Sequence, residues 1–317
     1  MNKIDSTLKK IYSNKKYGEL AALYQFFNNN LISAIESELS SDLTNTSGFF
    51  ENLYVDFQWI DKIPLADFHG EQRDINHNLI EDKTELGDLF IQYRHTFAYP
   101  DGKTVGVFPK INYSLVVQAK ISDEIPPVVP VGKVNKKRAN STSKELKLLE
   151  HWPEFDLYET ARSLKPLVKN IHVKPQDNAF SFFAAFNNRS KIWLFGKAKN
   201  SQICDLNFSD IIFGLKNQQY GKDIHTDTAW GAIASSITDI CQNRKIPQSI
   251  ANKIESRQKS AHIKDGTVYA FPLNILPFIT DCITKIASLF RKKKMLVIFI
   301  DRISFEGPAM EKYRKRS

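Results

Sequence analysis

Apolar residues spaced three and four apart indicate where the chain is helical. The first such pattern covers residues 17–39 and predicts one amphipathic helix, or two helices broken near residues 28–30. The same spacing predicts a helix over residues 143–151, with Ser143 as its N-cap. Residues 228–244 and 274–290 are also expected to be helical.

Strands are predicted where apolar residues alternate with polar ones or form short unbroken runs. Residues 88–97 and 113–121 form one such pair, and the Pro-Asp-Gly sequence within residues 99–103 is typical of a turn. We therefore expect an antiparallel hairpin with a long connection. Further strands are predicted at 179–185 and 192–195, as a second hairpin, and at 295–300, as a buried strand.

Two stretches carry little periodicity. Residues 49–80 contain short apolar segments interrupted by Pro64 and Gly70, and we interpret them as irregular, with one or two short strands. Residues 122–143 contain three prolines followed by a cluster of basic residues, and they predict a mobile basic loop. Strands mixed with helices in this way indicate an α/β or α+β fold.

The charge is divided unevenly along the 317 residues. The whole chain carries 44 Lys and Arg against 35 Asp and Glu, a formal charge of +9. Residues 1–120 hold 12 basic and 16 acidic side chains, whereas residues 291–317 hold nine basic and three acidic ones. This division suits a protein that gathers carboxylates around a cation in one region and meets a polyanion in another, although a solvated basic tail has the same composition.

The expected environment is a reducing cytoplasm. The three cysteines are widely spaced and show no Cys-x-x-Cys pairing, which argues against a disulfide framework and against a cysteine-based zinc site. The first twenty residues lack the apolar core of a secretory signal, and the uncharged run 266–280 is too short and too rich in proline to span a bilayer. We therefore expect a protein with no membrane span.

The candidate chemistry lies in the first predicted hairpin. Glu85 and Asp88 stand at the start of one strand, and Gln118-Ala119-Lys120 lies on the next. Side chains alternate along a strand, so Gln118 and Lys120 project to one face. A lysine among apolar neighbours is costly unless it faces a carboxylate, a phosphate or water. The hairpin can therefore bring a carboxylate, an amide and an ammonium together.

This arrangement resembles the catalytic core of the PD-(D/E)xK, or restriction-endonuclease-like, nuclease superfamily. Asp88 matches the first acid of its motif, and Gln118-Ala119-Lys120 matches the acid-x-Lys triplet with Gln in place of the second acid, as in Mrr-like members. The resemblance covers roughly residues 80–155. The Gln-x-x-x-Tyr element of RecB-type relatives is missing, because Glu145 and Leu149 stand at those positions.

The resemblance implies the fold and the organisation of the chain. We expect an α/β protein with a restriction-endonuclease-like mixed sheet flanked by helices and additional α+β elements at the C-terminal end. Residues 1–200 would form the nuclease-like core, with the N-terminal helix and the basic loop 122–143. Residues 201–317 would form an extension packed on that core, with a basic tail at 291–317.

The implied activity is hydrolysis of DNA phosphodiester bonds with Mg²⁺ or Mn²⁺. Asp88, Glu85, the Gln118 side-chain oxygen and the Ala119 backbone oxygen would hold the metal, since hard cations prefer oxygen ligands. Lys120 would orient the attacking water and stabilise negative charge in the transition state. Because Gln118 is neutral, metal affinity would be weak until substrate phosphate completes the site.

The implied partner is DNA, bound through the basic loop. Four of its side chains are candidates for phosphate contacts whose affinity falls with salt: Lys133, Lys136, Lys137 and Arg138. Residues 291–294 could also contact phosphate, or an anionic membrane surface. By analogy of fold, the protein would act in a bacterial anti-phage defence system with a partner protein or activating ligand, and as a homo-oligomer.

Other residues are candidates for roles at or near the site. Glu36 or Glu38 could supply the additional helix-borne carboxylate that many such nucleases carry, but a solvated acid is the simpler interpretation. His95 is expected to be an ordinary strand residue, and Trp152 a core anchor rather than a platform for a nucleobase. His225 and Asp227 have the spacing of a loop and no evident third ligand.

Two alternatives to a nuclease remain open. The chain could be a catalytically inactive nuclease fold that binds nucleic acid or a partner protein. The motif could also be a coincidence, since Gln-x-Lys occurs by chance in many edge strands and Asp after Gly is often a turn.

Overall fold

The computed structural model describes most of the chain in nine stretches. These are residues 2–43, 49–60, 64–101, 104–129, 139–174, 179–198, 203–225, 228–243 and 295–306. Four expectations therefore lie wholly or partly outside the described residues: the helix at 274–290, the uncharged run 266–280, the basic loop with its four cations, and most of the basic tail.

A mixed sheet of seven strands forms the centre of the molecule. Its order is β1-β11-β4-β5-β8-β9, and β10 pairs with β5 beside this path. The strands β11 and β4 run parallel, as do β5 and β8, and the other neighbours are antiparallel. Their bounds are β1 Phe49–Ile60, β4 Leu89–Asp101, β5 Thr104–Ser122, β8 Ser181–Asn187, β9 Ile192–Lys197, β10 Lys222–Asp223 and β11 Met295–Glu306. Mixed strands with flanking helices confirm the α/β class.

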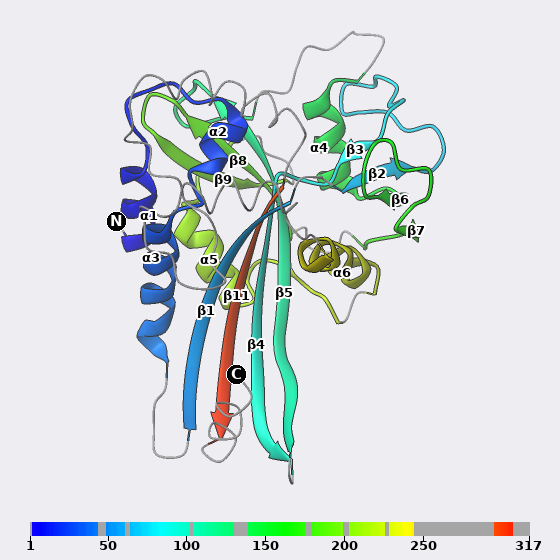
Figure 1. Cartoon of the computed structure of the whole chain (residues 1–317). Coiled ribbons are helices and arrows are strands. Elements are labelled where there is room, and N and C mark those ends of the chain that lie inside the picture. The colour runs from blue at the N-terminus through cyan, green and yellow to red at the C-terminus, as the bar shows by residue number, and fades with distance from the viewer. Residues whose placement is uncertain are drawn as a thin grey trace, which may run out of the picture.

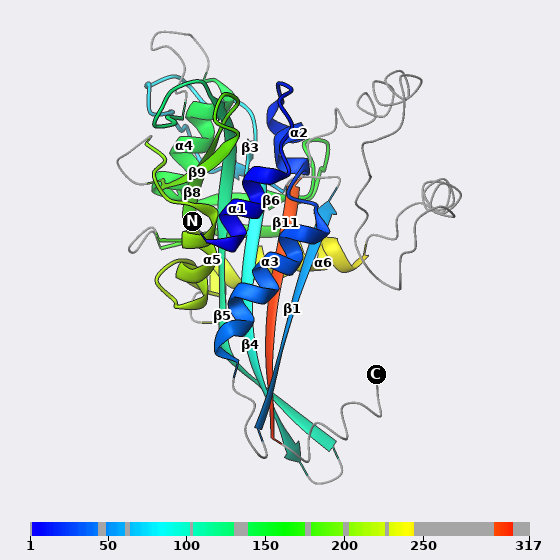
Figure 2. The same ribbon diagram turned by 90° about the vertical axis from the view of Figure 1, so that its left-hand side faces the viewer.

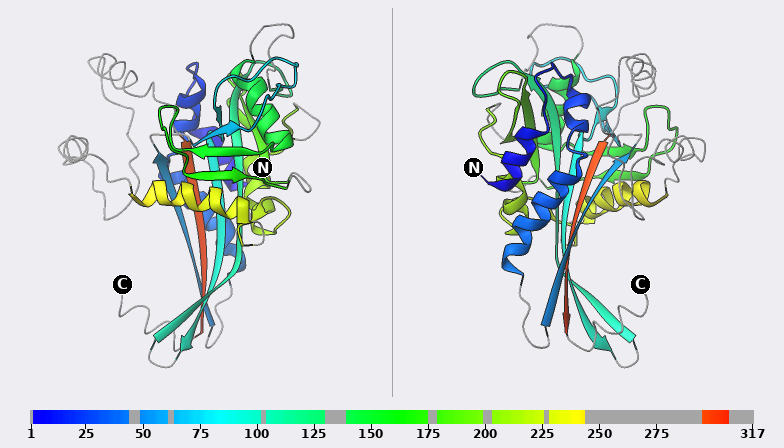
Figure 3. Two further views of the ribbon diagram at one scale, coloured as in Figure 1. Left: turned by 90° about the vertical axis from the view of Figure 1, so that its right-hand side faces the viewer. Right: turned by 60° about the vertical axis from the view of Figure 1, so that its left-hand side comes forward.

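Helices cover both faces of the upper half of this sheet (Figure 1). The helices α1 (Lys3–Lys10), α3 (Asn29–Leu39) and α5 (Phe208–Lys216) lie on one face (Figure 2). The helices α4 (Ser141–His151) and α6 (Thr228–Asn243) lie on the opposite face (Figure 3). The short helix α2 (Glu19–Tyr24) lies near the upper end of β5, and the 3-10 turn η1 (Ser40–Asp42) follows α3.

A second, smaller sheet packs beside α4 on the face that α6 covers (Figure 3). It has the order β3-β2-β6-β7, with bounds β2 Leu65–Phe68, β3 Thr84–Glu85, β6 Phe155–Tyr158 and β7 Val168–Ile171. His69, just after β2, contacts Asp156 on β6 at 2.9 Å and Glu154 at 3.3 Å. These contacts connect two strands that are distant in sequence.

The first hairpin is longer than the sequence suggested. The chain reverses within the predicted segment, because β4 extends to Asp101 and β5 starts at Thr104, with residues 102–103 outside the described residues. The prediction of a long connection between the two strands was wrong, since residues 98–101 of β4 pair with residues 104–107 of β5. The four long strands β1, β11, β4 and β5 therefore project beyond the helices at the lower end of the molecule (Figures 1 and 2).

The region 49–80, expected to be irregular with one or two short strands, contains the long strand β1 as well as the short strand β2, so the prediction was wrong for residues 49–60. Val55 and Phe57 of β1 are buried, whereas Tyr54 before them is exposed and Asp56 between them is half-buried, the alternation of a strand with one covered face. The strand pairs along its whole length with β11. Such pairing satisfies its backbone groups although its partner comes from the far end of the chain.

Most predicted helices are confirmed. The first pattern divides into α2 and α3 with a break at residues 25–28, and α6 matches its predicted range to within a residue. The start of α4 differs, because Asn140 rather than Ser143 is the N-cap. The Asn140 side chain accepts a bond from the Ser143 backbone N–H, and the Ser143 hydroxyl accepts one from the Asn140 backbone N–H. The helices α1 and α5 were not foreseen.

The predicted strand at 295–300 is confirmed as β11, which continues to Glu306 and lies inside the sheet between β1 and β4. Leu296, Val297 and Ile298 are completely buried, as expected for an internal strand with both faces covered. Among the described helices, none is long and apolar enough to cross a membrane.

Candidate functional site

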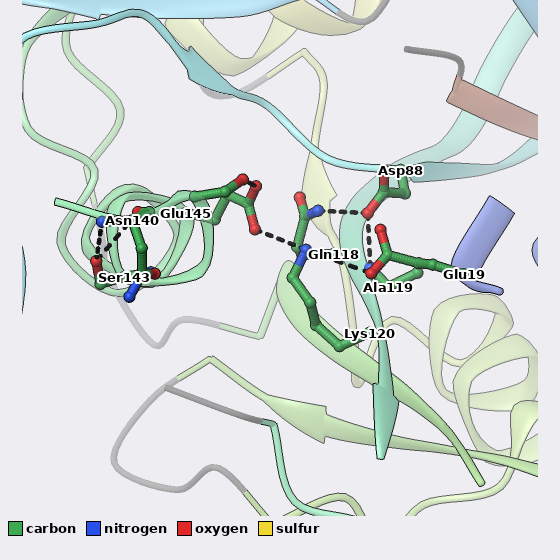
Figure 4. A network of polar contacts seen from close by, with 9 residues as sticks. Glu19, Asp88, Gln118, Ala119, Lys120, Asn140, Ser143 and Glu145 are labelled. Atoms are coloured by element: carbon green, nitrogen blue, oxygen red, sulfur yellow. Dashed lines mark hydrogen bonds and ion pairs between the residues drawn. The ribbon is translucent and has the colours of Figure 1, made fainter. Parts of the chain in front are cut away.

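Asp88 is fixed at the junction of three strands. It immediately precedes β4, where its backbone N–H donates to the Val117 carbonyl of β5 and its carbonyl accepts from the Leu296 N–H of β11. Its side chain turns toward β5, and Oδ2 accepts hydrogen bonds from the Ala119 backbone N–H at 2.9 Å and from the Gln118 amide. The Asp88 side chain is therefore held against the Gln-x-Lys triplet (Figure 4).

Gln118 has one satisfied and one unsatisfied end. Its Nε2 donates to Asp88, whereas its Oε1 is buried and lacks a hydrogen-bond partner in the described structure. The residue as a whole is 1% exposed. A buried amide oxygen without a donor costs free energy, which a cation or a donor group would recover.

Lys120 lies between two carboxylates from different helices. Its Nζ lies 2.9 Å from Glu145 Oε2 of α4 and 3.7 Å from Glu19 Oε2 of α2 (Figure 4). Lys120 is 8% exposed and Glu145 is 2% exposed, so this ion pair is nearly dry. Glu145 uses its other oxygen to accept a bond from the Ser141 hydroxyl in the first turn of α4.

The electrostatics of the cluster follow from burial and from its excess of acids. Burial raises the pKa of the Asp88 carboxyl well above its usual value, and the positive charge of Lys120 opposes this change. Burial likewise raises the pKa of Glu19. Burial alone would lower the pKa of Lys120, but the charges of Glu145, Asp88 and Glu19 outweigh it and the pKa is raised. Lys120 is therefore a permanent cation.

The structure brings most of the predicted site residues together. Asp88, Gln118 and Lys120 gather at one end of the sheet, and Ala119 contributes its N–H to Asp88. Glu85 at the end of β3 is half-buried and close enough for its charge to raise the pKa of Asp88. The four proposed phosphate-contacting cations, Lys133, Lys136, Lys137 and Arg138, lie outside the described residues.

Sequence reasoning missed both glutamates that contact Lys120. Glu145 departs from the RecB-type element, yet it precedes Leu148 and Leu149 by three and four residues and so shares their buried helix face. An acid on an apolar face was the available signal. Glu19 stands first in a six-residue helix, and no pattern in the sequence distinguished it.

Neither candidate for the helix-borne carboxylate lies at the site. Glu36 accepts a bond from the Val55 N–H of β1, and Glu38 accepts one from the Lys3 N–H of α1. These two acids connect α3 to β1 and to α1. The helix-borne carboxylate at the site comes instead from Glu19, which contacts Lys120.

The remaining candidates that the structure describes make structural contacts. Trp152 is 1% exposed and donates to the Ser181 hydroxyl, which confirms it as a core anchor. His95 contacts Ser304 at 2.7 Å inside a buried cluster on the long strands, as an ordinary strand residue. His225 contacts Asn112 at 3.4 Å, and Asp227 lies outside the described residues.

The donor set suits a hard cation but is incomplete by itself. Asp88 and Gln118 offer carboxylate and amide oxygens, the ligand type that Mg²⁺ prefers. In the described part of the chain, no three His, Cys, Asp or Glu side chains converge on a point that could hold a metal ion. A Mg²⁺ ion commonly keeps several waters and takes further ligands from substrate phosphates, so two protein ligands are compatible with such a site.

The chain matches no family model, no curated protein and no solved structure.

Proposed function

We propose that the protein is a Mg²⁺-dependent nuclease that hydrolyses phosphodiester bonds of DNA. The observation that carries the proposal is that the Asp88 carboxylate is hydrogen-bonded to Gln118 and Ala119 of the neighbouring strand, with Lys120 close enough for its charge to act on Asp88. A carboxylate and an amide oxygen can serve as metal ligands, and a nearby cation can stabilise the negative charge of the transition state.

Each residue has a defined task in this reaction. Asp88 and the Gln118 Oε1 atom would hold the metal, with Glu85 nearby as a further acid. A bound Mg²⁺ would polarise the phosphoryl oxygen and lower the pKa of the attacking water. Lys120 would stabilise the negative charge that develops on the phosphoryl oxygens, and Glu145 would keep its ammonium charged and in position.

The direct test is cleavage of plasmid and of linear DNA with Mg²⁺ or Mn²⁺. The wild-type protein should cut, and Asp88→Ala and Lys120→Ala should each lower the rate by at least about a hundredfold, the usual effect of removing a charge-stabilising group. Lys9→Ala, which removes an exposed lysine of α1, is the matched control and should cut normally. Equal cleavage by all four proteins would remove these residues from the mechanism.

A second candidate function is binding of nucleic acid without cleavage. The near-complete burial of Asp88, Gln118 and Lys120 favours it, because substrate must reach a site that is closed in this state. This candidate expects no metal-dependent cutting under any condition and an affinity for DNA that falls steeply with salt. Affinity that is unchanged between 50 and 200 mM salt would count against it.

A further inference from the structure

The two carboxylates on Lys120 differ in burial and in distance. Glu145 lies 2.9 Å from the ammonium, and its side chain is 2% exposed. Glu19 lies 3.7 Å away, and its side chain is 33% exposed. Figure 4 shows the two acids on different sides of the ammonium, one from α4 and one from α2. Glu145 is therefore the inner partner, and Glu19 faces solvent.

The inner pair is complete without Glu19. Glu145 accepts a hydrogen bond from the Ser141 hydroxyl at Oε1 and forms the ion pair with Lys120 at Oε2, where it has no hydrogen bond. Glu19 instead enters a region that already contains the charges of Asp88 and Glu145, and both repel it. The attraction of Glu19 to Lys120 is thus opposed by like charges. Glu145 lies closer to Lys120 and is also held by the Ser141 hydroxyl.

Glu19 is also placed where it can leave without disturbing the core. It is the first residue of α2, after Gly18, which makes no side-chain cap. The helix is anchored further along by Ala22 and Leu23, which are 0% and 1% exposed. Rotation of one terminal side chain would uncover the outer side of Lys120 while this anchor stays in place.

We infer that Glu19 is a displaceable counter-ion, which occupies the phosphate-binding side of Lys120 until a phosphate group of the substrate replaces it. Glu145 is the permanent partner that positions Lys120. The inference rests on the proposed function for the identity of the substrate, but the competition concerns any phosphate that reaches Lys120. An anion that approaches must therefore displace one carboxylate and not two.

The test measures phosphate binding in EDTA, where no cleavage occurs. The probes are inorganic phosphate, by calorimetry, and a fluorescent single-stranded DNA oligonucleotide, by anisotropy. Glu19→Gln should bind both about two- to fivefold more tightly than wild type, because an exposed competing ion pair is removed. Glu145→Gln should bind more weakly than wild type, because Lys120 loses the partner that positions it.

Two further variants separate competition from a change of net charge. Glu124→Gln removes an exposed acid just after β5 and makes the same change in charge, so it should bind as wild type does. Glu19→Gln combined with Lys120→Met should lose the gain in affinity. Thermal unfolding of each variant checks the fold, and if Glu145→Gln does not fold, the comparison of Glu19→Gln with Glu124→Gln decides.

Three results would overturn the inference: a Glu19→Gln protein that binds no more tightly than Glu124→Gln, a gain that survives Lys120→Met, or failure of Glu19→Gln to bind either probe. These outcomes are distinct from failure of the proposed nuclease activity. Tighter binding in EDTA with no cleavage in Mg²⁺ sustains the inference and removes the activity, whereas Mg²⁺-dependent cleavage with unchanged phosphate affinity does the opposite.

Discussion

The ammonium of Lys120 on β5 and the carboxylate of Glu145 on α4 form a buried ion pair 2.9 Å long. Such a pair gains little net stability over a well-packed apolar contact, because both ions lose their hydration. Removing one partner is costly, since the other stays buried with its charge uncompensated. The pair therefore constrains which substitutions at the site the fold tolerates.

We expect Lys120→Met to lower the free energy of unfolding by about 3–5 kcal/mol, the cost of leaving Glu145 as an unpaired buried charge. The double variant Lys120→Met with Glu145→Gln should recover more than half of this loss. Urea denaturation of the two single variants and the double variant gives the coupling energy. Additive losses would show that the two side chains do not interact in solution.

Asp88→Asn should stabilise the protein near neutral pH while it abolishes cleavage. Burial raises the pKa of Asp88 in the folded protein above its value in the unfolded chain. Between these two pKa values the folded protein binds more protons than the unfolded chain, so stability falls as pH rises. The variant lacks this loss, so at pH 7.5 its free energy of unfolding should be higher than that of wild type. The difference should shrink at pH 4.

Denaturant unfolding of both proteins at the two pH values measures this effect. Asp123→Asn, at an exposed position after β5, is the matched control and should change stability little at either pH. An Asp88→Asn protein that is less stable than wild type at pH 7.5 would mean that the Asp88 charge is stabilising in the fold.

His95 should make the long strands sensitive to acid. Its pKa is lowered to about 4, first by burial and then by the positive charges of Arg302 and Lys110. Between this value and the ordinary one near 6.5 the unfolded chain binds more protons, so stability rises with pH over that range. His95→Gln should flatten the dependence by up to about 3 kcal/mol, measured as the free energy of unfolding from pH 4 to 7.

His69 should contribute with the opposite sign. Its pKa is raised, chiefly by the hydrogen bond to Asp156, so its stabilising effect is present below the ordinary histidine pKa and is lost as pH rises through the raised value. His69→Gln should lower stability at pH 5.5 and have little effect at pH 8.5. The side chain is 36% exposed, which limits the effect to less than about 1 kcal/mol.

Thermal unfolding of His69→Gln and of His172→Gln at the two pH values tests this prediction. His172 is exposed at the end of β7, and its replacement should leave the pH dependence unchanged. A loss at pH 8.5 equal to that at pH 5.5 would show that the imidazole stabilises the small sheet by packing and not by its charge.

The local pattern predicted the elements whose signal lies within one segment. The break between α2 and α3, the helix α6 and the turn between β4 and β5 were all recognisable from spacing and turn residues. The strand β1 was missed although Leu53, Val55 and Phe57 alternate with polar residues. Its interruptions resembled a loop, and its partner β11 is supplied only by the far end of the chain.

For the site, the sequence by itself determined which groups the first hairpin presents. Alternation along β5 put Gln118 and Lys120 on one face, and the turn returned that face to Asp88. Only the tertiary structure decided the charge balance around Lys120. The parallel pair β5 and β8 requires a crossover connection, and this crossover carries α4 and Glu145 to the sheet, while packing of α2 brings Glu19 from the N-terminus. Contacts between such distant segments leave no periodic trace in the sequence, because each is set by packing rather than by local conformation.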